Sequence, residues 1–185
     1  MRIIAGRWKG HPLVAFKADH IRPTTDRVKE CLFNVIQFDI EGTKVADLFC
    51  GTGNLGLEAL SRGAHHVVFV EKSSKSLQIT RSNLTKLKAL PSEHDIVSQD
   101  VLKYLISYQG EPFDFIFADP PFTEAMAHDV LLAADQSAAF GAQTTLMIES
   151  ARRERLDDEY VTLIRTDRRE FGDKILSFFR KKESL

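Results

Sequence analysis

The chain has 185 residues, 43% of them apolar and 28% charged, and a formal net charge of −1. This length is enough for one domain with a full core, and the composition is that of an ordinary soluble protein. No run approaches the ~20 apolar residues that cross a bilayer, and the start of the chain is too poor in apolar residues for a secretory signal. We therefore expect one domain over residues 1–185, located in the cytoplasm and without a membrane partner.

The two cysteines and six histidines indicate no metal site. Cys31 and Cys50 lie far apart and outside any CxxC pattern, which favours free thiols in a reducing compartment. The histidines show no ligand spacing either, so we expect no metal cofactor.

The amino-terminal segment is basic, whereas the rest of the chain is mildly acidic. Residues 1–29 contain seven Lys or Arg and two Asp, a charge of +5, which leaves −6 for the remainder. Two short strands are expected within residues 2–16, around a turn at 6–10. A few contacts between basic side chains and phosphates can supply affinity for a nucleic acid. Residues 1–23 are therefore a candidate nucleic-acid-binding extension. A solvated, charge-rich surface is the alternative.

A helix is expected after Arg22 and Pro23, because Thr24 or Thr25 can cap it. Its apolar face follows the spacing i, i+3, i+4, i+7, i+8 and consists of Val28, Cys31, Leu32, Val35 and Ile36. A stripe of this width predicts that the helix packs on the core.

From residue 43 onward, apolar runs alternate with helical patterns. Strands are expected at 44–49, 66–71, 94–97, 113–118 and 144–149, and helices at 54–62, 74–88, 101–108 and 124–134. This alternation predicts an α/β fold with a mostly parallel sheet and helices on both faces. Two further strands at 160–166 and 174–179 flank a charged turn at 167–173. They should form a hairpin, so that one edge strand is antiparallel.

The first of these strands leads into a glycine-rich loop. Gly51, Gly53 and Gly56 form a G-x-G-x-x-G pattern that ends in a helix, where the backbone can turn tightly and approach a ligand. Glu71 follows Gly51 by 20 residues at the end of the next strand, the distance at which an acid binds ribose hydroxyls. The sequence thus predicts a cofactor that contains adenosine.

Asp47 helps to choose between two such cofactors. An acid four residues before Gly51 would repel a pyrophosphate but could hold a cationic group, directly or through water. This favours S-adenosyl-L-methionine, which carries a sulfonium and an ammonium and no phosphate, over a nicotinamide dinucleotide. Asp47 could alternatively cap a turn. Asp100 could accept from the adenine amino group or simply cap the helix at 101.

The strand at 113–118 ends in Asp119-Pro120-Pro121-Phe122. Pro121 biases Pro120 toward an extended conformation, so the Pro120 carbonyl is available to accept a hydrogen bond. Asp119 and this carbonyl can bind the two protons of a planar NH₂ group, while Phe122 stacks on the attached ring. In the alternative interpretation, Asp119 caps the next helix and Phe122 belongs to the core.

The glycine loop, Glu71 and Asp119-Pro120-Pro121-Phe122, in this order, resemble the S-adenosylmethionine-dependent amino-methyltransferases. More narrowly, the chain resembles the RsmD-type bacterial 16S rRNA guanine-N2 methyltransferases over nearly its full length. The segments that carry this likeness are Arg2-Ile3-Ile4-Ala5-Gly6, Arg22-Pro23-Thr24-Thr25-Asp26-Arg27-Val28-Lys29-Glu30 and Leu32-Phe33-Asn34. The family more often has Tyr in place of Phe122, and Ala-Gly-Ser-Gly in place of Cys50-Gly51-Thr52-Gly53.

The resemblance implies a Rossmann-like class I methyltransferase fold with a seven-stranded sheet and a small amino-terminal hairpin and helix. It also implies methylation of the exocyclic N2 of guanine 966 in 16S rRNA, within a small-subunit assembly particle, by a monomer. The catalytic residues would then be Asp119, Pro120, Pro121 and Phe122. We expect the cofactor at Asp47, Cys50, Gly51, Gly53, Asn54, Glu71, Lys72, Asp100 and Val101, and RNA at Arg2, Arg7, Lys9, Arg22 and Arg27.

The sequence leaves three alternative functions open. The Asp-Pro-Pro-Phe motif suits any exocyclic amine, so the target could be adenine N6 or cytosine N4 in DNA or in another RNA. A non-catalytic RNA-binding module and a nicotinamide-dependent reductase are the others. Arg22 or Thr25 could also close over the cofactor instead of contacting RNA.

Overall fold

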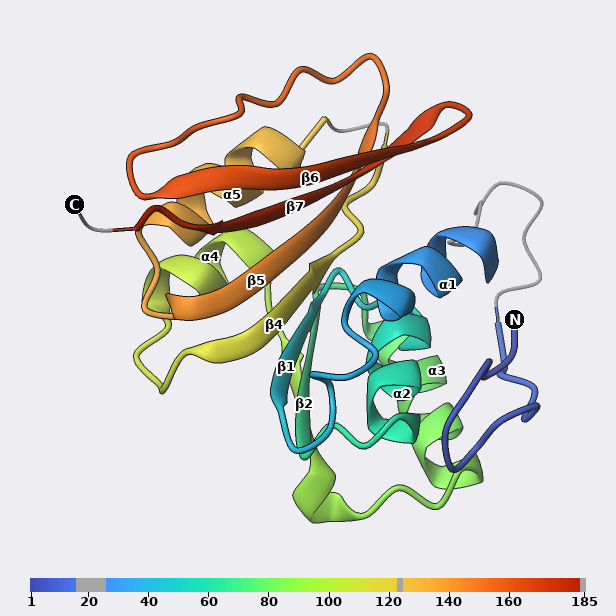
Figure 1. Cartoon of the computed structure of the whole chain (residues 1–185). Coiled ribbons are helices and arrows are strands. Elements are labelled where there is room, and N and C mark those ends of the chain that lie inside the picture. The colour runs from blue at the N-terminus through green and yellow to red at the C-terminus, as the bar shows by residue number, and fades with distance from the viewer. Residues whose placement is uncertain (16–25, 123–124, 184–185) are drawn as a thin grey trace.

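The fold is a single mixed sheet covered by helices on both faces. The computed structural model describes residues 1–15, 26–122 and 125–183. Its sheet has the strand order β3-β2-β1-β4-β5-β7-β6, and β1 to β5 are parallel neighbours (Figure 1). The strands are β1 (Lys44–Leu48), β2 (His66–Glu71), β3 (His94–Ser98), β4 (Phe113–Ala118), β5 (Phe140–Ala151), β6 (Leu163–Phe171) and β7 (Lys174–Lys181).

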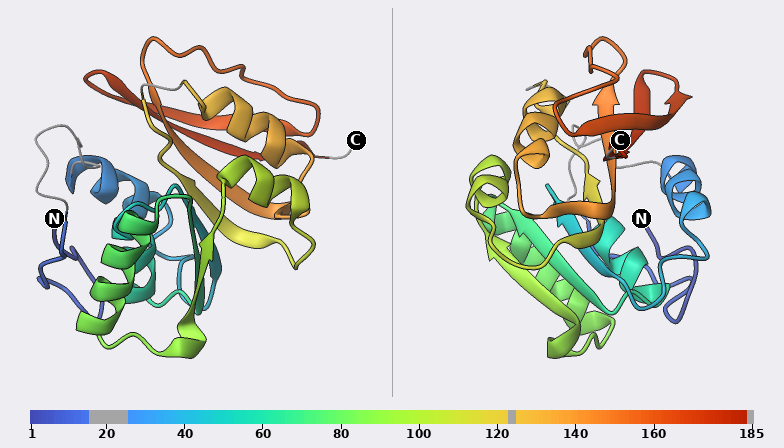
Figure 2. Two further views of the ribbon diagram at one scale, coloured as in Figure 1. Left: turned by 180° about the vertical axis from the view of Figure 1, so that it is seen from behind. Right: turned by 60° about the vertical axis from the view of Figure 1, so that its left-hand side comes forward.

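The helices divide between the two faces (Figure 2). Helices α1 (Asp26–Val35), α2 (Asn54–Ser61) and α3 (Ser74–Lys86) cover one face, and α4 (Val101–Ser107) and α5 (Ala127–Asp135) cover the other. A short 3₁₀ helix, Pro91–Glu93, precedes β3. Along β4, Phe115 and Phe117 point to the α1–α3 face and Ile116 to the α4–α5 face, as the two-residue period of a strand requires. The predicted α/β architecture is confirmed. None of the described helices has the length and apolarity to cross a bilayer.

The carboxy-terminal hairpin is confirmed, but its turn is shorter than predicted. Strand β7 pairs antiparallel with both β5 and β6, and β6 follows it as the edge strand of the sheet. The charged segment expected as a turn at 167–173 is mostly strand, because β6 continues to Phe171 and only Gly172 and Asp173 turn. An edge strand tolerates such charges, which here pair with one another, as Arg169 does with Asp167.

The apolar face of α1 is rotated from the predicted stripe. Val28, Leu32 and Ile36 are buried as expected, but Val35 is 39% exposed. Lys29 and Phe33 are fully buried in its place. The periodicity failed here because a lysine occupies a core position, where it is neutralised by a residue distant in sequence.

The amino-terminal arm, residues 1–15, is a loop packed on the body. The expected strands reduce to one antiparallel bridge between Arg2 and Pro12. Ile3, Trp8 and Leu13 are buried in the core of the α1–α3 face. The Ile4 and Ala5 amides donate to the Glu58 carboxylate at 2.8 and 2.9 Å. The arm is therefore held by α2.

Candidate active site at the carboxyl edge of the sheet

Four strands bring acidic residues to the edge of the sheet where parallel strands end. Asp47 lies in β1, Glu71 ends β2, Asp119 follows β4 and Glu149 lies near the end of β5. The register pairs Leu48 with Val70 on one side and with Ala118 on the other. This edge is also the general location of ligand sites in open α/β sheets.

The glycine loop follows β1 and is built from backbone conformations that favour glycine. Gly51 and Gly53 have φ of +55° and +82°. A Cβ at Gly51 would meet nothing closer than 3.9 Å, whereas a Cβ at Gly56 would lie 2.4 Å from the Phe69 ring. Gly51 thus leaves room beside the loop, and Gly56 allows α2 to pack closely on β2. Gly53 precedes α2 and packs near Thr80.

Glu71 connects β2 to this loop. One carboxylate oxygen accepts from the Gly51 amide at 3.3 Å and the other from the Ser73 amide at 2.8 Å. The side chain is half-buried, so it borders both the loop and solvent. Its position beside Gly51 agrees with the predicted ribose acceptor, a role that stays a prediction.

Asp47 lies beneath the loop and is only 2% exposed. Its Oδ2 accepts from the Gly56 amide at 2.8 Å, so the side chain stabilises the start of α2. Burial raises the pKa of Asp47 to about 7; the nearby Asp119 and Glu71 carboxylates add to this rise, and the Gly56 hydrogen bond opposes it. The geometry favours a structural role for Asp47 in holding the glycine loop. Because the side chain is buried, it would act on a bound cation through its charge and not by direct contact.

The other predicted cofactor residues have varied surroundings. Asn54 is 8% exposed and accepts from the Lys29 ammonium at 3.0 Å. Asp100 caps α4 by accepting from the Lys103 amide at 3.2 Å, so the capping alternative is confirmed for this residue. Three more lie along the same edge: Cys50 and Val101, which are buried, and Lys72, which is exposed. Burial raises the pKa of the Cys50 thiol, which keeps it uncharged.

Asp119-Pro120-Pro121-Phe122 lies directly beside the end of β1. The Asp119 amide donates to the Leu48 carbonyl at 3.4 Å, and the Asp119 side chain is half-buried. Pro120 is buried and Pro121 exposed, while Phe122 is half-buried. The sheet therefore brings the predicted amine-binding residues next to the glycine loop.

The simpler interpretation of Asp119 as a helix cap is wrong. Helix α5 begins at Ala127, and the Glu154 carboxylate accepts from the Ala127 and His128 amides at 2.8 and 3.4 Å. The cap thus comes from the segment after β5. The Asp119 carboxylate is not needed to terminate this helix.

Two residues that sequence reasoning missed border this motif. The Lys174 ammonium lies 4.5 Å from the centroid of the Phe122 ring and 2.8 Å from the Glu149 carboxylate. Their side chains are only 6% and 3% exposed. A sequence signal existed for Glu149, an acid near the end of a buried parallel strand like Asp47 and Glu71. None existed for Lys174, which is remote in sequence.

Four of the predicted RNA-binding residues, Arg2, Arg7, Lys9 and Arg27, lie within the described part of the chain. The Arg7 amide donates to the carbonyl of Ser61, the last residue of α2, so the turn at 6–10 lies at the end of this helix away from the glycine loop (Figure 1). The Arg7 guanidinium is already paired with Glu93 at 2.7 Å. Lys9, Arg2 and Arg27 are exposed, and Arg22 lies outside the described residues. The Lys29 ammonium contacts both the Arg2 carbonyl and Asn54, so Arg2 lies near the start of α2.

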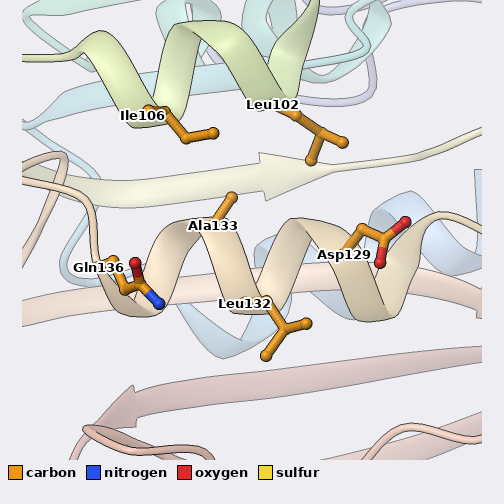
Figure 3. Close-up of a pocket in the computed structure, with 6 residues that line it drawn as sticks. All are labelled: Leu102, Ile106, Asp129, Leu132, Ala133 and Gln136. Atoms are coloured by element: carbon orange, nitrogen blue, oxygen red, sulfur yellow. The ribbon is translucent and has the colours of Figure 1, made fainter.

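A separate hollow of about 370 Å³ lies between α4 and α5 (Figure 3). It is lined by Leu102, Ile106, Asp129, Leu132, Ala133 and Gln136. It includes no residue of the glycine loop or of the Asp-Pro-Pro-Phe motif. We therefore assign the candidate site to the carboxyl edge and not to this hollow.

The chain matches a family model and several ribosomal RNA methyltransferases. The family model described as conserved hypothetical protein 95 matches residues 1–180. The chain is 39% identical to "Ribosomal RNA small subunit methyltransferase D" of Haemophilus influenzae over 132 residues, 71% of this chain and 68% of that protein. It is 33% identical to the Escherichia coli K12 protein of the same name over 150 residues, 81% of this chain and 74% of that protein.

A solved structure extends this similarity to nearly the whole fold. The structure titled "Putative methyltransferase yhhF from Escherichia coli" superimposes with a TM-score of 0.85 at 27% identity. The alignment covers 98% of each chain. The architecture is thus shared from the amino-terminal arm to the carboxy-terminal hairpin.

Proposed function

The chain belongs to the conserved hypothetical protein 95 family, the family of RsmD-type ribosomal RNA methyltransferases, and on this basis we propose that it methylates guanine 966 of 16S rRNA at N2. The methyl donor is S-adenosyl-L-methionine, and the protein acts as a cytoplasmic monomer on a small-subunit assembly particle. The observation that supports this most is the position of Asp119, whose amide meets the end of β1 beside the glycine loop. A methyl donor bound at the glycine loop and an amine bound at Asp119 can therefore meet at this edge of the sheet.

The residues of the loop suit a cationic cofactor without phosphate. Gly51 leaves open space, the Glu71 carboxylate accepts from its amide, and Asp47 lies buried beneath the loop. Lys29, a buried cation that contacts Asn54 of the loop, is already paired with Glu58 at 3.1 Å. Carboxylates in this arrangement would repel a pyrophosphate and attract a sulfonium and an ammonium.

Glu71 would accept from the ribose hydroxyls, and the loop from Cys50 to Asn54 would lie along the cofactor, with Asp47 beneath it. Lys72, Asp100 and Val101 would border its nucleoside end. S-adenosylmethionine supplies an electrophilic methyl group on a sulfonium. Transfer is an in-line displacement, so the protein's main task is to hold the nitrogen behind this methyl group in the correct direction.

Asp119 and the Pro120 carbonyl would accept hydrogen bonds from the two N–H groups of guanine N2. This orients a weakly nucleophilic amine and stabilises the positive charge that develops on it. The half-buried Asp119 carboxylate can take up the released proton during or after transfer. Phe122 would stack on a base that has left its own stack in the RNA. The RNA phosphates would bind Arg2, Lys9, Arg22 and Arg27. Arg7 would bind a phosphate once its ion pair with Glu93 is broken.

Methyl incorporation separates this proposal from its rivals. The protein and methyl-labelled S-adenosylmethionine are incubated with 16S rRNA, with small ribosomal subunits and with DNA. We expect label in the rRNA, naked or in subunits, as N2-methylguanosine, and none with the Asp119→Ala variant. Label in adenine or cytosine would favour the other amine targets. Absence of label with every substrate would favour a binding module.

A further inference from the structure

We propose that Lys174, neutralised by Glu149, is a positioning residue that fixes the Phe122 ring for stacking on the target base. This inference rests on the proposed function. It concerns two buried charged residues that the cofactor and amine contacts described above leave without a role.

The direction of β7 explains how Lys174 reaches the site. Because β7 runs antiparallel to β5, its first residue lies at the edge where the parallel strands end. Lys174 there pairs with Ala151, just past Glu149 on β5. A hairpin from the end of the chain thus places a cation beside a motif more than fifty residues earlier.

The Lys174 ammonium interacts with two groups, a carboxylate and an aromatic ring. Its ammonium is 2.8 Å from the Glu149 carboxylate and 4.5 Å from the Phe122 ring centroid, a distance at which a cation is attracted to an aromatic face. The side chain is 6% exposed, so little water competes for it. The attraction is accordingly strong and directional.

Burial also prevents the lysine from being displaced by the base. Moving Lys174 away would break its 2.8 Å ion pair with the Glu149 carboxylate, which is 3% exposed, and breaking a buried pair is costly in a protein interior. The base must then use the opposite face of the ring. Lys174 therefore acts as the back support of Phe122, which keeps its other face toward the base.

The main test is a double-mutant cycle on methyl transfer to 16S rRNA. Lys174→Met with Glu149→Gln removes both charges of the buried ion pair, and this double variant is combined with Phe122→Leu. We expect the charge-free pair to lower kcat about tenfold in the presence of Phe122 and to have little effect in the Phe122→Leu background. S-adenosylmethionine affinity by calorimetry should stay unchanged. Lys174→Arg should restore most of kcat, and Lys181→Met, at the far end of β7, serves as the matched control.

Two results would overturn the inference: an unchanged kcat in the folded charge-free variant, or equal losses with and without Phe122. A second cycle, on the unfolding equilibrium, needs no substrate and should also show coupling between Lys174 and Phe122. Its absence would contradict the contact itself. The activity of the wild-type protein on rRNA reports on the proposed function, whereas the unfolding cycle reports on the Lys174–Phe122 contact without any substrate. The failure of one is therefore distinguished from the failure of the other.

Discussion

Two buried lysine–glutamate pairs lie near the active edge, one between α1 and α2 and one between β5 and β7, and their surroundings differ. Lys29 and Glu58 are both 0% exposed, and Glu58 also binds Arg62 and the Ile4 and Ala5 amides. Lys174 and Glu149 are nearly as buried, but the lysine borders an aromatic ring of the candidate site. Buried pairs add little net stability by themselves. The comparison therefore suggests that the first pair anchors the arm to α2 and the second serves the target base.

The largest effect is expected from the target side, at Asp119. Asp119→Ala should lower kcat about 10²–10³-fold, because it removes an acceptor for the developing positive charge. The cofactor affinity should stay nearly unchanged. Single-turnover methyl transfer and calorimetry measure the two quantities, with Asp129→Ala, an exposed acid on α5, as the control. Retained turnover would remove Asp119 from the mechanism.

Removal of the first lysine should affect stability more than turnover. Lys29→Met should lower the free energy of unfolding by about 3 kcal/mol, because Glu58 stays buried with only Arg62 and backbone donors. Urea denaturation measures this, and Lys103→Met on the exposed face of α4 provides the baseline. A loss below about 1 kcal/mol would show that the anchor is dispensable.

On the cofactor side, Glu71→Ala should weaken S-adenosylmethionine binding about 30–100-fold, since hydrogen bonds to a carboxylate are lost. Calorimetry tests this, and Glu111→Ala, an exposed acid before β4, is the comparison variant. Unchanged affinity would place the ribose elsewhere. Turnover at saturating cofactor should fall much less than in Asp119→Ala.

The pH dependence of the free energy of unfolding should reflect the raised pKa of the buried Asp47. Its folded pKa of about 7 lies above the value of about 4 in an unfolded chain, so the folded state holds an extra proton between these values. The stability from this proton is full below about pH 4 and is lost as the pH rises through about 7. The wild-type free energy of unfolding should therefore fall relative to Asp47→Asn by on the order of 1 kcal/mol per pH unit in this window. A difference that is constant with pH would contradict this assignment.

The smallest effect is expected at the arm. Lys9→Ala should reduce the slope of log K against log salt for rRNA binding by about 0.7–0.9, the value for one phosphate contact. Arg7→Ala should change it less, since Arg7 is paired with Glu93. Filter binding at several salt concentrations, with exposed Lys88→Ala as control, measures the slopes. Equal slopes for Lys9→Ala and the wild type would place the RNA away from the turn at 6–10.

Local patterns predicted most of the fold, because alternating apolar runs determine strand and helix faces without distant partners. The strand at 113–118 and the β2 strand ending in Glu71 were predicted with their bounds. The rotation of α1 was not predictable, because it depends on the burial of Lys29 against Glu58, on another helix. The glycine loop after β1 and the Asp-Pro-Pro-Phe motif after β4 were both noted in the sequence, and the sheet brings them side by side at the candidate site.

The support behind Phe122 could not be predicted, because it depends on how the chain returns to the sheet. Lys174 appeared in the sequence only as the start of a terminal strand. Lys174 reaches the candidate site because β7 runs antiparallel beside β5. The end of β6 was not predicted, because charged residues typical of a turn can form an edge strand when they pair with one another along it, as Arg169 does with Asp167.

The central claim, methyl transfer to guanine N2 in 16S rRNA, is tested most directly by mass mapping of rRNA from cells that lack this protein. We predict that a single methyl group is missing from guanine 966 and that the wild-type protein restores it, whereas Asp119→Ala does not. A fully methylated guanine 966 in those cells, or a methyl group missing from another base instead, would contradict the account.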